Sequence, residues 1–272
     1  MHWILQSNLQ TDYYGGTGDW DKLVEAVQRF DLPFSLHKVV PFSGELIPPA
    51  TPTQDKVICF GTYSMRHTAK AMNWNPGVYD LEQIDFPIQR EHWGDDMLNA
   101  DSLVCRFEDV KIEEPTFLRP SNDTKFFSGK IYDPEEFHEW QHKVVVEKYD
   151  YGNSLTNDTM IQVSKPKTIY AEYRYWIVDG EIVTRSLYKR GQRVMYSADV
   201  GREVDLYVAG KTRGSIHAIA HNPHKWLPKA YVFDVCETPD GFKIVEINTL
   251  NAAGFYAGDI LKIVHALEEL ER

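Results

Sequence analysis

Three oxygen-bearing side chains near the C-terminus, Asp234, Glu246 and Asn248, have the types and spacing of a magnesium site. Residues 231–250 predict two strands joined by a turn at 239–241. Asp234 lies on the first strand, and Glu246 and Asn248, two residues apart, share one face of the second. Mg²⁺ prefers oxygen ligands and completes its octahedron with water and substrate phosphates. The pattern therefore predicts three ligands for Mg²⁺.

The alternative for so short a pattern is an exposed strand edge that carries ordinary acidic residues. The second strand, 243–250 (KIVEINTL), is largely apolar. A carboxylate buried unpaired in such a strand would cost several kcal/mol. This apolar context favours the metal site.

The segments before this hairpin predict a mixed α/β fold. Strand-like and helix-like runs alternate from residue 2 to residue 74, as in an α/β unit. From about residue 111 the pattern changes to paired strands with turns between them. The second half is predicted to contain a strand at 116–120, a polar flap-like loop at 121–130, a helix opened by Pro134, a strand at 144–150 buried on both faces, a hairpin at 171–189 turning at Asp179 and Gly180, and a C-terminal amphipathic helix at 259–272.

In order and spacing, this half of the chain resembles the ATP-grasp enzymes. The resemblance covers residues from about Thr116 to the C-terminal helix and is carried by FLRPSNDTKFFSG, EYRYWIVDG and EINTLNAAGFY. These segments are most similar to an ATP-grasp group of viruses and bacteria whose substrates are mostly unassigned. The resemblance implies an N-terminal α/β domain (1–110) followed by a two-lobed ATP-grasp domain (111–272), with ATP between the lobes.

The resemblance also implies residue roles. Arg119 and Lys125 would bind the phosphates of ATP, the first from a strand and the second from the flap. Arginine replaces the lysine usual in the family, and its planar fork suits phosphate. Glu147, Lys148 and Tyr149 would form the hinge that receives adenine, although a core strand that simply ends at the surface explains the same residues.

Two arginines on the 171–189 hairpin compete for a role at the transferred phosphate. Arg174 follows Glu172 on the first strand and shares its face, and Arg185 lies on the returning strand. One of them is expected to meet the γ-phosphate or an acyl phosphate, and a salt bridge is the competing role for the other. We favour Arg174 as the functional arginine, together with Lys125.

The implied reaction is phosphoryl transfer from Mg²⁺-bound ATP to a substrate carboxylate, which gives an acyl phosphate that an amine attacks to form an amide. The protein would then be an ADP-forming carboxylate–amine ligase acting on an amino acid, peptide or protein. Asn251 lies where the family turns toward the acceptor. Two other functions remain open: an inactive nucleotide-binding or interaction module, and a phosphotransferase without an amine acceptor. The residues name neither substrate nor oligomeric state.

Composition agrees with a cytoplasmic enzyme that acts on small-molecule or peptide substrates. The formal net charge of −11 argues against a duplex nucleic-acid partner. Basic residues concentrate between 165 and 213, which suits a small polyanion or simply a solvated face. No run of apolar residues predicts a membrane helix, and three scattered cysteines predict no disulfide framework.

Two further patterns are weaker. His217, His221 and His224 have a spacing that suits a metal on a helical face, but no carboxylate or cysteine accompanies them. An exposed helix end before Pro223 explains them equally. The glycines of 14–18 do not match a dinucleotide fingerprint.

Overall fold

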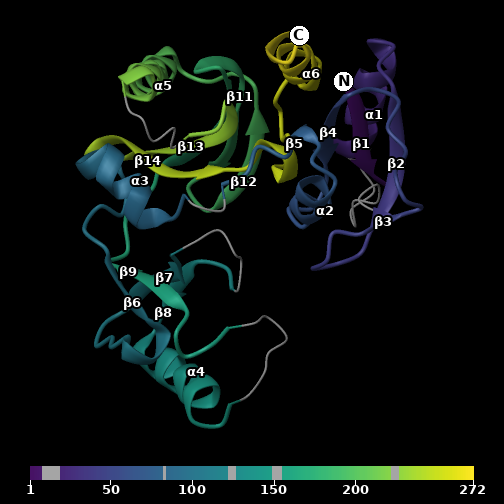
Figure 1. Ribbon diagram of the computed structural model, residues 1–272. Coiled ribbons are helices and arrows are strands. Elements are labelled where there is room, and N and C mark those ends of the chain that lie inside the picture. The colour runs from purple at the N-terminus through teal and green to yellow at the C-terminus, as the bar shows by residue number, and fades with distance from the viewer. Residues whose placement is uncertain (8–18, 82–83, 122–126, 149–154, 222–226) are drawn as a thin grey trace. The chain divides into compact units, whose positions relative to one another are not determined.

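The computed structural model describes residues 1–7, 19–81, 84–121, 127–148, 155–221 and 227–272 (Figure 1). The described chain forms two compact units. The first comprises Met1–Asp80, Ala171–Val235 and Ile247–Arg272, and the second comprises Leu81–Tyr170 and Cys236–Glu246. The mixed α/β class predicted from the sequence is confirmed. The proposed boundary between residues 110 and 111 stays a prediction.

The first unit begins with a mostly parallel sheet of order β3-β2-β1-β4-β5, in which β1 pairs in parallel with β2 and β4. Its middle strands are runs of large apolar residues, as expected for strands covered on both faces. The strands are β1 (His2–Gln6), β2 (Phe34–Val39), β3 (Leu46–Ile47), β4 (Lys56–Phe60) and β5 (Asn75–Gly77), and the helices of this segment are α1 (Asp19–Arg29) and α2 (Met65–Ala71).

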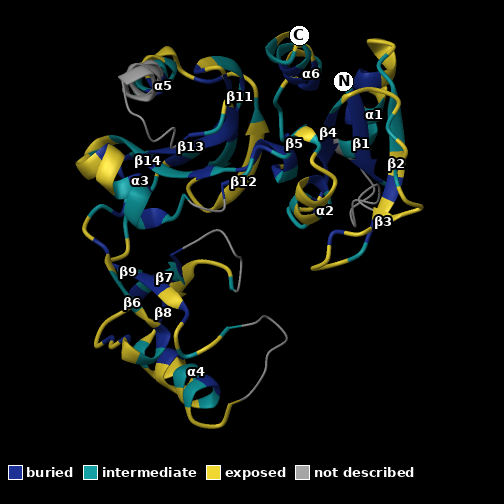
Figure 2. Ribbon diagram, viewed as in Figure 1, coloured by how far each residue is buried: buried dark blue, intermediate teal, exposed yellow. Residues whose placement is uncertain are grey.

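Side-chain alternation along β1 divides the core of this sheet into two clusters. Trp3 and Leu5 pack with α1 and with the C-terminal helix α6 (Ile260–Leu270), whereas Ile4 faces the opposite cluster with Met65 of α2. Figure 2 shows these strands as buried. The alternation is what a period of two requires of a strand between two layers.

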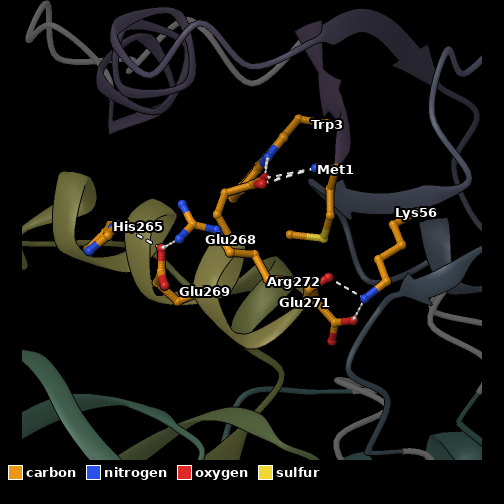
Figure 3. A network of polar contacts seen from close by, with 8 residues as sticks. All are labelled: Met1, Trp3, Lys56, His265, Glu268, Glu269, Glu271 and Arg272. Atoms are coloured by element: carbon orange, nitrogen blue, oxygen red, sulfur yellow. Dashed lines mark hydrogen bonds and ion pairs between the residues drawn. The ribbon is translucent and has the colours of Figure 1, made fainter.

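Helix α6 is tied to the first strands by charged groups (Figure 3). Glu268 accepts a hydrogen bond of 2.7 Å from the indole N–H of Trp3 and pairs with the Met1 ammonium at 3.0 Å. Lys56 of β4 binds the carboxylate and the backbone carbonyl of Glu271. The end of the chain is therefore fixed to its beginning.

The second sheet has the order β12-β11-β10-β13-β14. Asp179 and Gly180 have φ angles of 49° and 75°, so the predicted tight turn between β10 and β11 is confirmed. The hairpin predicted at 231–250 is also present. The elements are β10 (Ala171–Val178), β11 (Glu181–Arg190), β12 (Arg193–Ser197), β13 (Ala230–Thr238) and β14 (Gly241–Asn248), with α5 (Arg202–His221) between β12 and β13.

The second unit contains an antiparallel sheet of order β6-β9-β7-β8. Its apolar residues cluster around Phe107, Leu118 and Phe137, which lie under helix α4. The elements are β6 (Leu103–Arg106), β7 (Thr116–Pro120), β8 (Lys130–Tyr132), β9 (Met160–Ser164), α3 (Phe86–Trp93) and α4 (Pro134–Val145).

The strand predicted at 144–150 is wrong, because α4 continues through Val145. Phe137 and Val144, seven residues apart, pack into one core, so the helical period continues and overrides the β-propensity of the valines. Val146 is 62% exposed, which is incompatible with a strand buried on both faces. The strand that follows α4 is β9, which pairs with β7. None of the helices, within the described residues, is long and apolar enough to cross a membrane.

Candidate functional site

Arg174 and Asp234 form a bidentate pair inside the first unit. They lie on β10 and β13, which are neighbours in the sheet. Arg174 donates from Nε to Oδ1 of Asp234 at 2.9 Å and from Nη2 to Oδ2 at 2.7 Å. Arg174 is 9% exposed and Asp234 2%. A charge so deeply buried persists only with a partner, and each of these residues supplies it for the other.

Asn248 and Gly254 complete this cluster. Asn248, near the end of β14, donates from Nδ2 to Oδ2 of Asp234 at 3.1 Å. Arg174 donates from Nη1 to the carbonyl of Gly254 at 3.4 Å. Asp234 therefore accepts three hydrogen bonds from two side chains, and the amide of Asn248 presents an oxygen at its other terminus.

Opposing effects set the pKa of Arg174. Burial lowers it, but the Asp234 carboxylate and its hydrogen bonds more than compensate, so the pKa is raised well above the ordinary value. The guanidinium is therefore positive at every accessible pH. A fixed cation with planar donor geometry suits a phosphate or carboxylate oxygen.

Two tyrosines border the guanidinium. Its Cζ atom lies 4.8 Å from the ring centroid of Tyr256 and 5.7 Å from that of Tyr188. Tyr188 donates its hydroxyl to Glu172 at 2.9 Å, and Lys189 pairs with Glu172 at 2.8 Å. Burial first, and then the charges of Asp234 and Glu172, raise the pKa of Tyr188 well above its usual range. Tyr188 therefore stays a neutral phenol.

The second unit holds a second arginine–carboxylate pair. Arg119 on β7 donates from Nη2 to Oε2 of Glu246 on β14 at 2.5 Å, and both side chains are 24% exposed. Glu246 lies two residues before Asn248 on the same strand. Both carboxylates predicted as metal ligands are thus bound to the arginines predicted to meet phosphate.

Arg185 has a different partner. It forms an ion pair of 2.9 Å with Asp205 of α5, and Asp205 also accepts from the Tyr175 hydroxyl at 2.9 Å. The competing salt bridge foreseen for one of the two arginines is thus present at Arg185, although its partner is a helix residue and not a cross-strand residue. Arg174 is the one of the two that contacts Asp234.

The predicted adenine hinge does not follow a strand. Glu147 and Lys148 come after the end of α4, where His142 lies 3.7 Å from Glu147. Tyr149 and Lys125 lie outside the described residues, so their predicted roles stay predictions. The segment that follows a strand in the sheet of Arg119 begins after Ser164, at the end of β9.

Asn251 has a structural role within the first unit. Its Oδ1 accepts from the backbone N–H of Tyr79 at 2.8 Å, and its Nδ2 donates to the carbonyl of Cys59 at 2.7 Å. The side chain is 3% exposed. It links the short helix Leu250–Ala252 after β14 to β4 and thereby fixes the chain next to Asn248.

Metal ligands other than the predicted oxygen set are not gathered in one place. Among the described residues, no group of three or more His, Cys, Asp and Glu side chains is arranged to hold a metal ion. His217 and His221 lie on α5, but their side chains, like all of His224, are outside the described part. The predicted set combines carboxylates with the amide of Asn248.

Sequence reasoning missed the tyrosines around Arg174. Tyr188 lies on the strand opposite Arg174, and Tyr256 lies in the loop after β14 with a φ of 51°. Only the first could have been found, since it faces Arg174 across a predictable hairpin. The second depends on the path of a loop that spacing does not predict.

The chain matches one protein-family model, described as an ATP-grasp domain of clade family 3, over residues 57–267. The match includes Arg119, Arg174, Asp234, Glu246 and Asn248. No curated protein sequence matches this chain.

Solved structures have the same fold at low identity. A D-alanine–D-alanine ligase from Bacillus anthracis complexed with ATP matches with a TM-score of 0.61 and 13% identity, covering 100% of this chain and 99% of that one. An ATP-grasp RimK domain protein from Sphaerobacter thermophilus gives 0.56 and 15%, with 93% and 92% covered. An L-amino acid ligase from Bacillus licheniformis gives 0.55 and 12%, with 91% and 67% covered.

Proposed function

The chain belongs to the ATP-grasp domain family, clade family 3, and from this premise we propose that it is an ATP-dependent, ADP-forming carboxylate–amine ligase. The observation that carries the proposal is the buried cluster of Arg174, Asp234 and Asn248. A degenerate module would have no reason to keep a cation and two cation ligands together in an apolar strand environment.

The proposed nucleotide cofactor is ATP with Mg²⁺ bound by Asp234, Glu246 and Asn248. These residues fit a hard cation, because they offer two carboxylates and an amide oxygen. Both carboxylates are already neutralised by guanidinium groups, so each lies where positive charge stabilises it. When bound, the metal would neutralise phosphate charge during transfer.

The chain's own cations would do the remaining electrostatic work. Arg119 and Lys125 would bind ATP phosphates, and Arg174 would stabilise charge on the transferred group or on the substrate carboxylate. These groups orient the reactants and neutralise charge, which phosphoryl transfer needs more than it needs a strong base.

The segment after β9 is our revised candidate for the adenine hinge. The resemblance places the hinge after the strand that follows the helix, and in this chain that strand is β9 and not 144–150. Residues 165–167 then replace Glu147, Lys148 and Tyr149 as the first hinge candidates. Backbone groups leaving an edge of the sheet would read the base.

The substrates are proposed from chemistry and from the fold neighbours. The matched structures include ligases of D-alanine and of L-amino acids. An acyl phosphate followed by attack of an amine is therefore the reaction we propose here, on an amino acid, peptide or protein. We place it in the cytoplasm, since all three cysteines are free thiols.

Isothermal titration with ATP, with and without Mg²⁺, tests the nucleotide site. We expect Mg²⁺-dependent binding that Glu246→Gln weakens at nearly unchanged side-chain volume. Glu45→Gln, a change at an exposed residue of the N-terminal segment, is the matched control. No binding by folded wild-type protein would contradict the proposal, and ADP release without any amine requirement would favour a phosphotransferase.

A further inference from the structure

Strand β12 (Arg193–Ser197) is exposed on both of its faces. Val194 is 70% exposed, Met195 48% and Tyr196 57%. A strand in the edge position normally covers its apolar side chains against a neighbouring layer or replaces them with charges. Three consecutive exposed apolar side chains on an edge strand indicate a surface that another chain covers.

One edge of β12 is open within the described part of the chain. The strand pairs with β11 through Leu187–Ser197, Lys189–Val194 and Arg190–Arg193, and it ends the sheet order. No strand among the described residues pairs with its other edge. The N–H and C=O groups of such an edge are a template for an added strand.

The hairpin that ends in β12 is positively charged. Arg190 and Arg193 are register partners beside the turn at Gly191, where φ is 55°. Both are exposed, and neither forms an ion pair with another described residue. Facing guanidinium groups of this kind favour an acidic partner.

A stack of rings connects β12 with Arg174. The ring of Tyr196 lies 5.0 Å from that of Tyr256 at an interplanar angle of 25°. Tyr256 lies 5.2 Å from Tyr188 at 23°, and the guanidinium of Arg174 lies 4.8 Å from the Tyr256 centroid. The exposed strand is therefore joined by direct contacts to the arginine of the proposed reaction site.

We infer that β12 is the docking strand for the carboxylate substrate, which is an acidic peptide segment that adds to its open edge and presents its carboxylate toward Arg174. The inference rests on the proposed function, because Arg174 is its reactive end. Main-chain hydrogen bonds along β12 supply affinity, Arg190 and Arg193 select acidic side chains, and Tyr196 covers the apolar part of the segment.

Fluorescence anisotropy with a labelled peptide of alternating Glu and Val residues tests this inference without nucleotide. We expect binding, no binding of the corresponding Lys–Val peptide, and a loss of about tenfold in affinity for Arg190→Glu/Arg193→Glu. Lys38→Glu/Lys111→Glu changes the net charge equally at exposed lysines elsewhere and is the matched control. Tyr196→Ala should weaken binding without changing the charge.

Peptides N-methylated at alternate residues separate strand addition from charge attraction. Loss of binding supports the inference, and equal binding of the methylated peptide overturns it. A dimer in sedimentation velocity that Arg190→Glu/Arg193→Glu dissociates, without peptide binding, would assign β12 to a second copy and overturn it as well. Calorimetry with ATP reports separately on the proposed function: ATP binding without peptide binding rejects only the docking strand.

Discussion

Arg174 occupies both carboxylate oxygens of Asp234, at 2.9 and 2.7 Å, so the proposed phosphate ligand neutralises the proposed metal ligand. Arg119 and Glu246 repeat the relationship at 2.5 Å. Binding of Mg²⁺ and ATP would exchange these partners, since carboxylates would turn to the metal and guanidinium groups to phosphate. The charge balance is preserved through the exchange, which avoids an unpaired buried charge.

Mg²⁺ alone is expected to bind weakly, because it must displace guanidinium groups that have no anion to receive them. Calorimetric titration of Mg²⁺ should show an affinity at least about tenfold higher in the presence of a non-hydrolysable ATP analogue, an ordinary size for coupling between sites. Equal affinity in both conditions would contradict the exchange of partners.

Removal of Arg174 alone should destabilise the first unit strongly. Arg174→Met leaves the Asp234 carboxylate, which is 2% exposed, without its cation and with Asn248 as a remaining donor. Breaking a buried pair in this way costs about 3–5 kcal/mol. Urea unfolding followed by circular dichroism measures the loss, and a variant as stable as the wild type would show that the pair is not buried.

The double variant Arg174→Met/Asp234→Leu is the control for this prediction. Apolar residues of similar volume often replace a buried ion pair at little cost, so we expect most of the stability to return. ATP binding should not return with it. Restored stability without restored binding separates the structural contribution of the pair from its proposed function.

Arg119 should contribute to nucleotide affinity more than to stability. Its pair with Glu246 is partly exposed, so its loss costs little. Arg119→Ala should weaken Mg²⁺–ATP binding by about tenfold or more, and Arg119→Lys should retain part of the affinity, because it keeps the charge but loses the planar fork. Unchanged affinity in Arg119→Ala, measured by calorimetry, would remove this residue from the site.

Asn251 should behave in the opposite way. Its amide bonds the backbone of Tyr79 and Cys59, so Asn251→Ala leaves a buried donor and a buried acceptor unsatisfied. We expect a loss of about 1–3 kcal/mol per unsatisfied group. Thermal unfolding measures the loss. ATP affinity of the folded variant should change little, and a selective loss of affinity in a fully stable protein would assign Asn251 to the substrate side instead.

Local patterns predicted the elements that position the proposed site. The hairpin turn at Asp179 and Gly180 needs positive φ angles, and β7 and β14 have clear strand sequences, so their residues could be placed from sequence alone. The valines of 144–146 could not, because their branched side chains favour a strand while the core contact of Val144 continues a helix. The hinge prediction failed with that strand.

The contacts that neutralise the carboxylates were also beyond the sequence. Spacing places Asp234 and Arg174 on strands, but it does not say which strands are neighbours in a sheet. Likewise, Tyr256 reaches Tyr196 and Tyr188 through the path of a loop. Long-range pairing decides these contacts, and one sequence without partners for comparison does not encode it visibly.

A buried chain of polar groups links β1 and β2 and predicts acid sensitivity. His37 donates from Nδ1 to the carbonyl of Pro48 at 2.6 Å, so its Nε2 accepts from the Ser35 hydroxyl at 2.7 Å. Ser35 then accepts from Nε2 of His2 at 3.0 Å, and Nδ1 of His2 accepts from the N–H of Thr53 at 3.3 Å. This network requires both imidazoles to be neutral.

Burial, followed by the nearby His37 and the N-terminal ammonium, lowers the pKa of His2 below its ordinary value of 6.5. Below pH 6.5 the unfolded chain therefore binds more protons than the folded chain, and stability falls with falling pH until the pKa of the folded state is passed. Above that window the contribution is complete. We expect the midpoint of thermal unfolding to fall more between pH 7 and about pH 5 in the wild type than in His2→Gln, which has no titratable ring. The exposed His67→Gln is the control, and identical pH profiles for wild type and His2→Gln would show that His2 does not limit acid stability.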